Sequence, residues 1–160
     1  MHKVKINLIK KETFYVCGYS VETTLADNSK DVSALYNDFF RSGKESILRR
    51  LKGSKNGYYG LSWYTKNHDR YCYLLGIEVG PENHASENTE LKVIPTTTYA
   101  VAYFPEGDDI IEAWTKFYYN VIPENGYKVN DEHNFYFEYY PNNVHGKYEL
   151  WVPVIKAPKK

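Results

Sequence analysis

The chain has 160 residues, of which 42% are hydrophobic, and this is enough for one substantial core but short for two. Its 20 Lys and Arg residues balance its 20 Asp and Glu residues, so it lacks the basic surface that nucleic-acid-binding proteins usually need. No stretch approaches the roughly 20 apolar residues of a membrane helix, and residues 1–6 do not resemble a signal peptide. We therefore expect one cytoplasmic domain over residues 1–160, with no direct nucleic-acid partner and no membrane contact.

The first half of the chain predicts a strand, a helix and a hairpin, in that order. Residues 14–21 are rich in β-branched and aromatic side chains, which favour a strand. A helix is expected to start near Ser29, and Gly43 is expected to end or interrupt it. Its apolar residues recur at helical spacing: Val32, Leu35, Tyr36, Phe39 and Phe40. Residues 58–79 predict a hairpin with its turn at 66–69.

The polar residues 80–90 then lead into a second half with the same order of elements. Residues 97–104 predict a strand, and residues 105–109 predict a turn that ends on a helix N-cap. The apolar stripe of this second helix comprises Ile110, Ile111, Trp114, Phe117, Tyr118 and Val121. Residues 123–126 are expected to stop the helix, and residues 135–154 are expected to form the closing hairpin.

The two halves together predict a duplicated α+β fold, with pseudo-repeats at about residues 12–79 and 91–156. Each repeat is a strand–helix–strand–strand module. One module alone would leave an apolar sheet face and a helix stripe uncovered, so the two are expected to share one mainly antiparallel sheet. The two principal helices are expected on one face of this sheet, with a groove between the modules.

Aromatic residues are unusually frequent, with 17 Tyr, 7 Phe and 3 Trp. Each buried Tyr hydroxyl needs a hydrogen-bond partner or a wet cavity. A ligand pocket with aromatic walls would account for the excess, and so would exposed strand positions, where Tyr is a good β-former. Composition leaves both explanations open.

The sequence shows no metal site and no cofactor motif, so we expect neither a metal nor a cofactor. The two cysteines, Cys17 and Cys72, are too few and too isolated for a metal site. Four histidines lie in turn-like segments without the spacing of metal ligands: His68, His84, His133 and His145. The G-x-S-x-G motif and the phosphate-binding glycine loop are both absent from the sequence.

An ordered set of motifs runs through the second half. The motifs are Tyr99-Ala100-Val101, Gly107, Trp114, Pro-Glu-Asn-Gly-Tyr at residues 123–127, Phe137-Glu138-Tyr139-Tyr140, and Glu-Leu-Trp-Val-Pro-Val at residues 149–154. In this order they resemble the GyrI-like, or AraC-type, effector-binding domain family of bacterial transcription activators and multidrug-binding proteins. The first half matches the family only in its pattern of elements.

The resemblance implies two strand–helix–strand–strand modules with a ligand groove between them. It also implies hydrophobic ligands, often cationic or planar aromatic, whose charge a strand Glu in an aromatic pocket commonly meets. Glu138 occupies that motif position, and Glu149 is the second acid that such pockets sometimes use. Many relatives carry this domain behind a helix-turn-helix DNA reader, for which a first strand near residue 12 leaves no room. We therefore expect a stand-alone small-molecule-binding protein, either a sequestering module or a sensor that acts through a separate protein partner.

Strand alternation places Glu138 on one face with Tyr136 and Tyr140. If this face lines the groove, a carboxylate among aromatic rings forms a cation site. The alternative is that the three residues form the exposed face of an edge strand. The spacing of the residues leaves both open, and the family motif favours the groove.

The three tryptophans and Glu149 complete the expected ligand-binding set. Trp114 and Trp151 are interpreted either as core residues or as ligand walls, and Trp63 and Tyr64 are candidates for the opposite wall. Glu149 is read either as a groove acid or as a solvent-facing strand residue. The alternative function is hydrolysis of a strained electrophilic molecule, with Glu138 as general base, and the sequence leaves open whether the protein is an enzyme.

Overall fold

The computed structural model describes residues 6–65, 70–86, 88–132 and 135–158. The expected turn at 66–69, with His68, and His133 lie outside the described residues. The elements, in chain order, are β1 (Asn7–Lys11), β2 (Phe14–Thr23), α1 (Asn28–Arg41), α2 (Lys44–Arg49), β3 (Tyr58–Tyr64), β4 (Tyr71–Val79), β5 (Glu90–Ile94), β6 (Thr97–Phe104), α3 (Ile110–Lys116), the π-helical turn η1 (Phe117–Val121), α4 (Ile122–Glu124), β7 (Tyr127–Val129), β8 (Tyr136–Tyr140) and β9 (Tyr148–Lys156).

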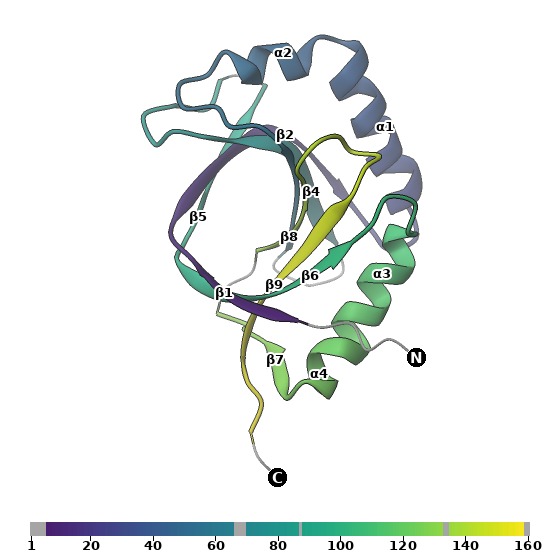
Figure 1. Ribbon diagram of the computed structural model, residues 1–160. Helices are drawn as coiled ribbons and strands as arrows, with labels where there is room; N and C mark the ends of the chain where they lie inside the picture. Colours follow the sequence, from purple (N-terminus) through teal and green to yellow (C-terminus); the bar gives the residue numbers. More distant parts are fainter. Residues whose placement is uncertain (1–5, 66–69, 87, 133–134, 159–160) are drawn as a thin grey trace.

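The strands form one antiparallel sheet in the order β1-β6-β9-β8-β3-β4-β2-β5, with β7 paired to β9 off this path. The two halves meet at the centre, where β3 lies beside β8 and Gly60 is paired with Glu138. The sheet curls strongly, and Figure 1 views it along the curl, with the helices on its outer side. The predicted α+β class with a mainly antiparallel sheet is confirmed.

The first strand of each half pairs with a strand of the other half. β1 pairs with β6, and β5 pairs with β2. Thr13 follows β1 and Thr96 follows β5, and the two residues are joined by a pair of hydrogen bonds. The backbone N–H of Thr13 donates to the Thr96 hydroxyl at 2.9 Å, and the backbone N–H of Thr96 donates to the Thr13 hydroxyl at 3.1 Å. Neither β1 nor β5 was predicted, since residues 7–11 and 90–94 are short and mixed in polarity. Their exchange joins the two halves along both outer strands.

The helices α1 and α3 cover the same face of the sheet, as expected (Figure 1). Gly43, with φ of 81°, ends α1, and Asp109 caps α3 by accepting hydrogen bonds from the backbone N–H groups of Ile111 and Glu112. The second helical run continues through η1 and ends at Glu124, within the predicted stop at residues 123–126. A new helical turn starts at Ile122, so Pro123 lies where a missing backbone N–H costs little.

Strand alternation divides the core between the two faces of the sheet. On the helix side, one cluster packs under α1 and α2 and another packs under α3 and η1. On the concave side, a third cluster fills the curl of the sheet. It comprises Phe14, Val16, Tyr59, Leu61, Leu74, Ile94, Tyr99, Val101 and Phe137. The sheet therefore carries packed side chains on both faces, and the groove described below lies between the two helix-side clusters.

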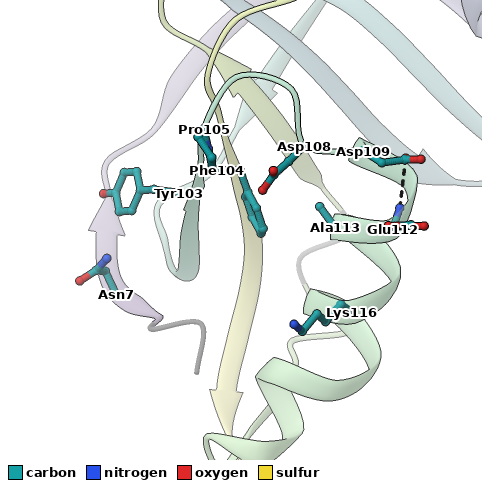
Figure 2. A pocket seen from close by; sticks show the side chains of 9 residues that line it. All are labelled: Asn7, Tyr103, Phe104, Pro105, Asp108, Asp109, Glu112, Ala113 and Lys116. Atoms are coloured by element: carbon teal, nitrogen blue, oxygen red, sulfur yellow. Dashed lines mark hydrogen bonds between the residues drawn. The ribbon is translucent and has the colours of Figure 1, made fainter. Parts of the chain in front are cut away.

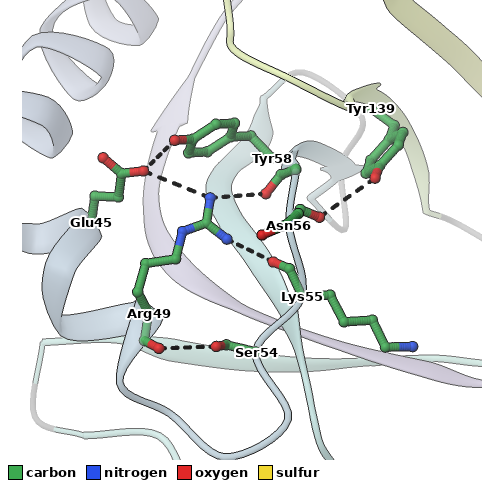
Figure 3. A network of polar contacts seen from close by, with 8 residues as sticks. Glu45, Arg49, Ser54, Lys55, Asn56, Tyr58 and Tyr139 are labelled. Carbon is green, nitrogen blue, oxygen red and sulfur yellow. Dashed lines mark hydrogen bonds and ion pairs between the residues drawn. The ribbon is translucent and has the colours of Figure 1, made fainter.

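A polar network anchors α2 to the start of β3 (Figure 3). The Arg49 guanidinium donates hydrogen bonds to the carbonyl oxygens of Lys55, at 2.6 Å, and Gly57, at 3.3 Å. The Glu45 carboxylate accepts from the Tyr58 hydroxyl and lies 3.6 Å from Arg49. These contacts fix the loop that leads into β3, the strand that carries part of the groove floor.

Among the described residues, no helix combines the length and the apolar character needed to cross a membrane.

Candidate functional site

A groove of about 820 Å³ lies between α1 and α3, over the central strands of the sheet. A volume of this size is typical of small-molecule sites. Its walls come from α1 and from α3 with η1, and its floor comes from β3, β4 and β8. The floor carries polar and aromatic side chains from both halves: Ser62, Tyr64, Tyr71, Tyr73, Tyr136, Glu138 and Tyr140.

Glu138 lies at the floor of this groove and is 7% exposed. Tyr136 and Tyr140 line the same groove, as strand alternation predicts. The alternative placement on an exposed edge strand is wrong, because β8 is paired on one side with β3 and on the other with β9. Trp114, on α3, and Tyr64, on β3, line the groove as well. Five of the eight candidate site residues therefore lie together.

Both oxygens of the Glu138 carboxylate accept hydrogen bonds from groove residues. The Trp114 indole Nε1–H donates to Oε2 at 2.7 Å, and the Tyr73 hydroxyl donates to Oε1. The Tyr73 oxygen is in turn 2.5 Å from the Tyr36 hydroxyl oxygen on α1. The carboxyl group is thus connected to α3 through Trp114 and to α1 through the two phenols.

Burial raises the pKa of Glu138 above its usual value, because removal from water disfavours the ionised form. The hydrogen bonds from Tyr73 and Trp114 oppose part of this effect, since they stabilise the carboxylate. No ion pair to Glu138 is found among the residues that the structure describes. A cation that enters the groove would therefore meet the Glu138 carboxyl group, which has no counter-ion among the described residues.

This raised pKa makes a prediction about stability. The unfolded chain ionises Glu138 near the ordinary value of about 4.3, whereas the folded protein ionises it only at a higher pH. Between these two pKa values the folded state holds the extra proton, so the free energy of unfolding should fall as pH rises through this window. In Glu138→Gln this fall should be absent. Urea unfolding of both proteins from roughly pH 4 to pH 9 measures it, and a difference that is constant across pH would contradict the assignment.

The sequence did not single out the first-half residues of the site, Tyr36, Ser62 and Tyr73. Tyr73 and Ser62 are buried polar groups on adjacent strands, and their registers place them on the face of Glu138. Because Tyr71 and Tyr73 lie two positions apart in a predicted strand, the sequence indicates that their side chains share a face of the sheet. The sequence could not say which helix and which second strand would meet that face.

Three predicted site residues, Trp63, Glu149 and Trp151, are not brought to the groove. Trp151 stacks on Phe137 in the concave cluster, with ring centroids 5.3 Å apart, and donates a hydrogen bond to Glu149 at 2.9 Å. Trp63 packs against the same cluster, with the Lys92 ammonium 4.5 Å from its ring centroid. These residues lie on the opposite face of the sheet, so the expectation that they share the pocket of Glu138 is corrected.

The mouth of the groove is rimmed by exposed apolar side chains, in contrast to its polar floor. They come from the segment before α1, from α1, from α3 and from η1: Leu25, Phe40, Ile111 and Tyr119. Arg41 and His145 also line the groove, and both are exposed. The groove therefore combines an acidic floor with an apolar entrance.

A second cavity, of about 590 Å³, lies between β1, the end of β6 and α3 (Figure 2). Three acids line it, Asp108, Asp109 and Glu112, together with Lys116. Asp109 is engaged in capping α3. This cavity contains none of the predicted site residues, and its acids are accounted for by the helix start, where negative charge is favourable. In the described part of the chain, no group of three or more His, Cys, Asp or Glu side chains could hold a metal ion.

Comparison with known proteins identifies a family and several similar structures. The family described as integron-associated effector binding protein matches residues 7–154. Similar solved structures include SAV2435 bound to tetraphenylphosphonium, with 12% identity, 94% of each chain covered and a TM-score of 0.77. An integron cassette protein from Vibrio cholerae has 18% identity, covers 94% of this chain and 95% of its own, and has a TM-score of 0.64. The C-terminal domain of EcmrR has 14% identity, with 96% and 99% covered and a TM-score of 0.64. No curated protein sequence matches this chain.

Proposed function

Because the chain belongs to the family of integron-associated effector binding proteins, we propose that it binds a hydrophobic cation in the groove between α1 and α3. The family membership confirms the resemblance to GyrI-like effector-binding domains. In this proposal the protein works either as a sensor that acts through a separate protein or as a sequestering protein.

The observation that carries the proposal is the buried Glu138 carboxyl group on the groove floor. It has hydrogen-bond donors but no ion-pair partner among the described residues. A carboxylate in such surroundings attracts positive charge more strongly than one in water, because the local dielectric constant is lower. SAV2435, which shares the fold, was solved with the permanent cation tetraphenylphosphonium.

Aromatic side chains supply the second element of recognition. Besides Tyr73, Tyr140 and the rim residues Phe40 and Tyr119, six aromatic side chains line the groove: Tyr36, Tyr64, Tyr71, Trp114, Tyr118 and Tyr136. A ring face contributes about 0.5–2 kcal/mol to the binding of a desolvated cation. The proposed binding set is therefore Glu138 with these rings. It keeps Tyr64, Tyr136, Tyr140 and Trp114 from the sequence prediction and leaves out Trp63, Glu149 and Trp151.

The test is charge preference and its loss in Glu138→Gln. Phenyltrimethylammonium should bind more tightly than its neutral carbon isostere, tert-butylbenzene. In Glu138→Gln the affinity for the cation should fall by roughly 1–4 kcal/mol, the range for two opposite charges about 4 Å apart at effective dielectric constants between those of water and of a protein surface, while the neutral isostere should be little affected. Quenching of tryptophan fluorescence provides a readout, because Trp114 lines the groove. Equal losses of affinity for both molecules would mean that Glu138 shapes the groove but does not discriminate between charged and neutral ligands.

Hydrolysis of a strained electrophile is the second candidate, and the raised pKa of Glu138 is the observation that favours it. A general base works best when its pKa lies near the working pH. The two candidates are separated by turnover. Product formation from such a substrate that disappears in Glu138→Gln would establish hydrolysis, whereas saturable binding without turnover supports the effector-binding function.

A further inference from the structure

Besides Glu138, the titratable side chains that line the groove are phenols, apart from Arg41 and His145 at the rim. The phenols are those of Tyr36 on α1, Tyr64 on β3, Tyr71 and Tyr73 on β4, Tyr118 and Tyr119 on η1, and Tyr136 and Tyr140 on β8. From α3, Trp114 contributes an indole that does not titrate. Arg41 and His145 complete the charged or titratable lining, and both are exposed. An ionised Glu138 in the ligand-free protein would therefore be a buried charge without a close counter-ion, which is costly.

The hydrogen-bond network around Glu138 can be satisfied in either protonation state. When the carboxyl group is ionised, Tyr36 donates to Tyr73 and Tyr73 donates to Oε1. When it is protonated, the acid O–H donates to the Tyr73 oxygen, and Tyr73 donates to Tyr36, because a phenol is both a donor and an acceptor. Trp114 donates to Oε2 in both cases. The chain of two phenols thus reverses direction without any movement of heavy atoms.

We propose that Glu138 carries a proton in the ligand-free protein and releases it to solvent when a cation enters the groove. The O–H bond of the carboxyl group breaks, its electron pair stays on the carboxylate, and the proton passes to water or buffer. The arriving cation then supplies the missing counter-charge. This inference rests on the proposed function and adds a proton to the binding equilibrium.

Proton release sets the sign of the pH dependence. At low pH the cation must displace the proton, so its affinity should rise tenfold for each unit of increasing pH. Once Glu138 is already ionised in the free protein, the affinity should become independent of pH. A neutral ligand has no reason to displace the proton, so its affinity should not increase with pH.

Isothermal titration calorimetry with tetraphenylphosphonium, from roughly pH 5 to pH 9 in two buffers of different ionisation enthalpy, tests the proposal. Because the buffer takes up any released proton, the difference between the two measured enthalpies counts the protons. We expect one proton per cation where the affinity rises with pH, and none where it is level. In Glu138→Gln this contribution should vanish, and any effect of His145 or Arg41 should remain as background.

The pH dependence of cation affinity in the variant Tyr73→Phe is a second, independent test of the proposal. This variant keeps the ring but removes the hydroxyl that stabilises the carboxylate. Its affinity profile should therefore level off at a higher pH than that of the wild type, a shift that a purely structural role of Tyr73 would not produce. An unshifted profile would contradict the reversible phenol chain.

The other outcomes separate this inference from the proposed function. A cation that binds with pH-independent affinity and no proton release, yet binds weakly to Glu138→Gln, would overturn the proton exchange and leave the cation site standing. Absence of cation binding at every pH, in a protein that is folded by circular dichroism, would overturn both.

Discussion

Replacing Gly60 with alanine is expected to abolish the cation site. Gly60 is paired with Glu138 across the central strands, and a Cβ atom there would meet the Tyr73 hydroxyl and Glu138 Oε1 closer than side chains approach one another in proteins. Both groups are buried, so neither can swing away into solvent. The hydrogen bond between them must break or move. We expect the affinity for phenyltrimethylammonium to fall at least as far as in Glu138→Gln.

The same substitution should also destabilise the fold, because overpacking a buried site costs about 1–3 kcal/mol. Binding and chemical denaturation are therefore measured on the same samples. Gly146→Ala is the matched control, since a Cβ there would have ordinary neighbours at 3.4 and 3.5 Å on Asn143, in the turn before β9. Wild-type affinity in Gly60→Ala would show that the carboxyl group is not held as described.

The largest effect on stability is expected from Phe137→Ala. The Phe137 ring is 1% exposed, stacks on Trp151 and contacts the rings of Phe14, Tyr59 and Tyr99. Removal of a buried Phe side chain costs about 3–5 kcal/mol through lost transfer free energy and the cavity left behind. For a chain of this length that loss lowers Tm by roughly 6–20 °C. Thermal unfolding followed by circular dichroism is the measurement.

Tyr119→Ala is the control for this prediction, because Tyr119 is also aromatic but 68% exposed. Its free energy of unfolding should stay within about 0.5 kcal/mol of the wild type. A loss below 1 kcal/mol in Phe137→Ala would contradict the packing of the concave cluster. Since Phe137 points away from the groove, the folded fraction of Phe137→Ala should keep its cation affinity.

Local patterns in the sequence were sufficient for the elements of the fold and for the centre of the site. The N-cap before α3 was predicted from side chains near one another in the chain, and the structure places it at Asp109. The shared face of Tyr136, Glu138 and Tyr140 follows from the alternation of side chains along any strand. Short strands were missed, because five residues of mixed polarity in β1 and β5 carry little periodicity.

Strand register, in contrast, was decided by the tertiary structure. Glu138 is paired with Leu150 across β8 and β9, so Leu150 shares its face and Glu149 takes the opposite one. Likewise Ser62, paired with Tyr136, faces the groove, and Trp63 does not. A register shifted by one residue would have reversed both assignments, because successive side chains point to opposite faces. The sequence by itself therefore determined which residues within a strand share a face. Only the long-range pairing of β8 with β3 and β9, with the packing of α1 and α3 above them, decided that Tyr36, Tyr73 and Trp114 meet at Glu138.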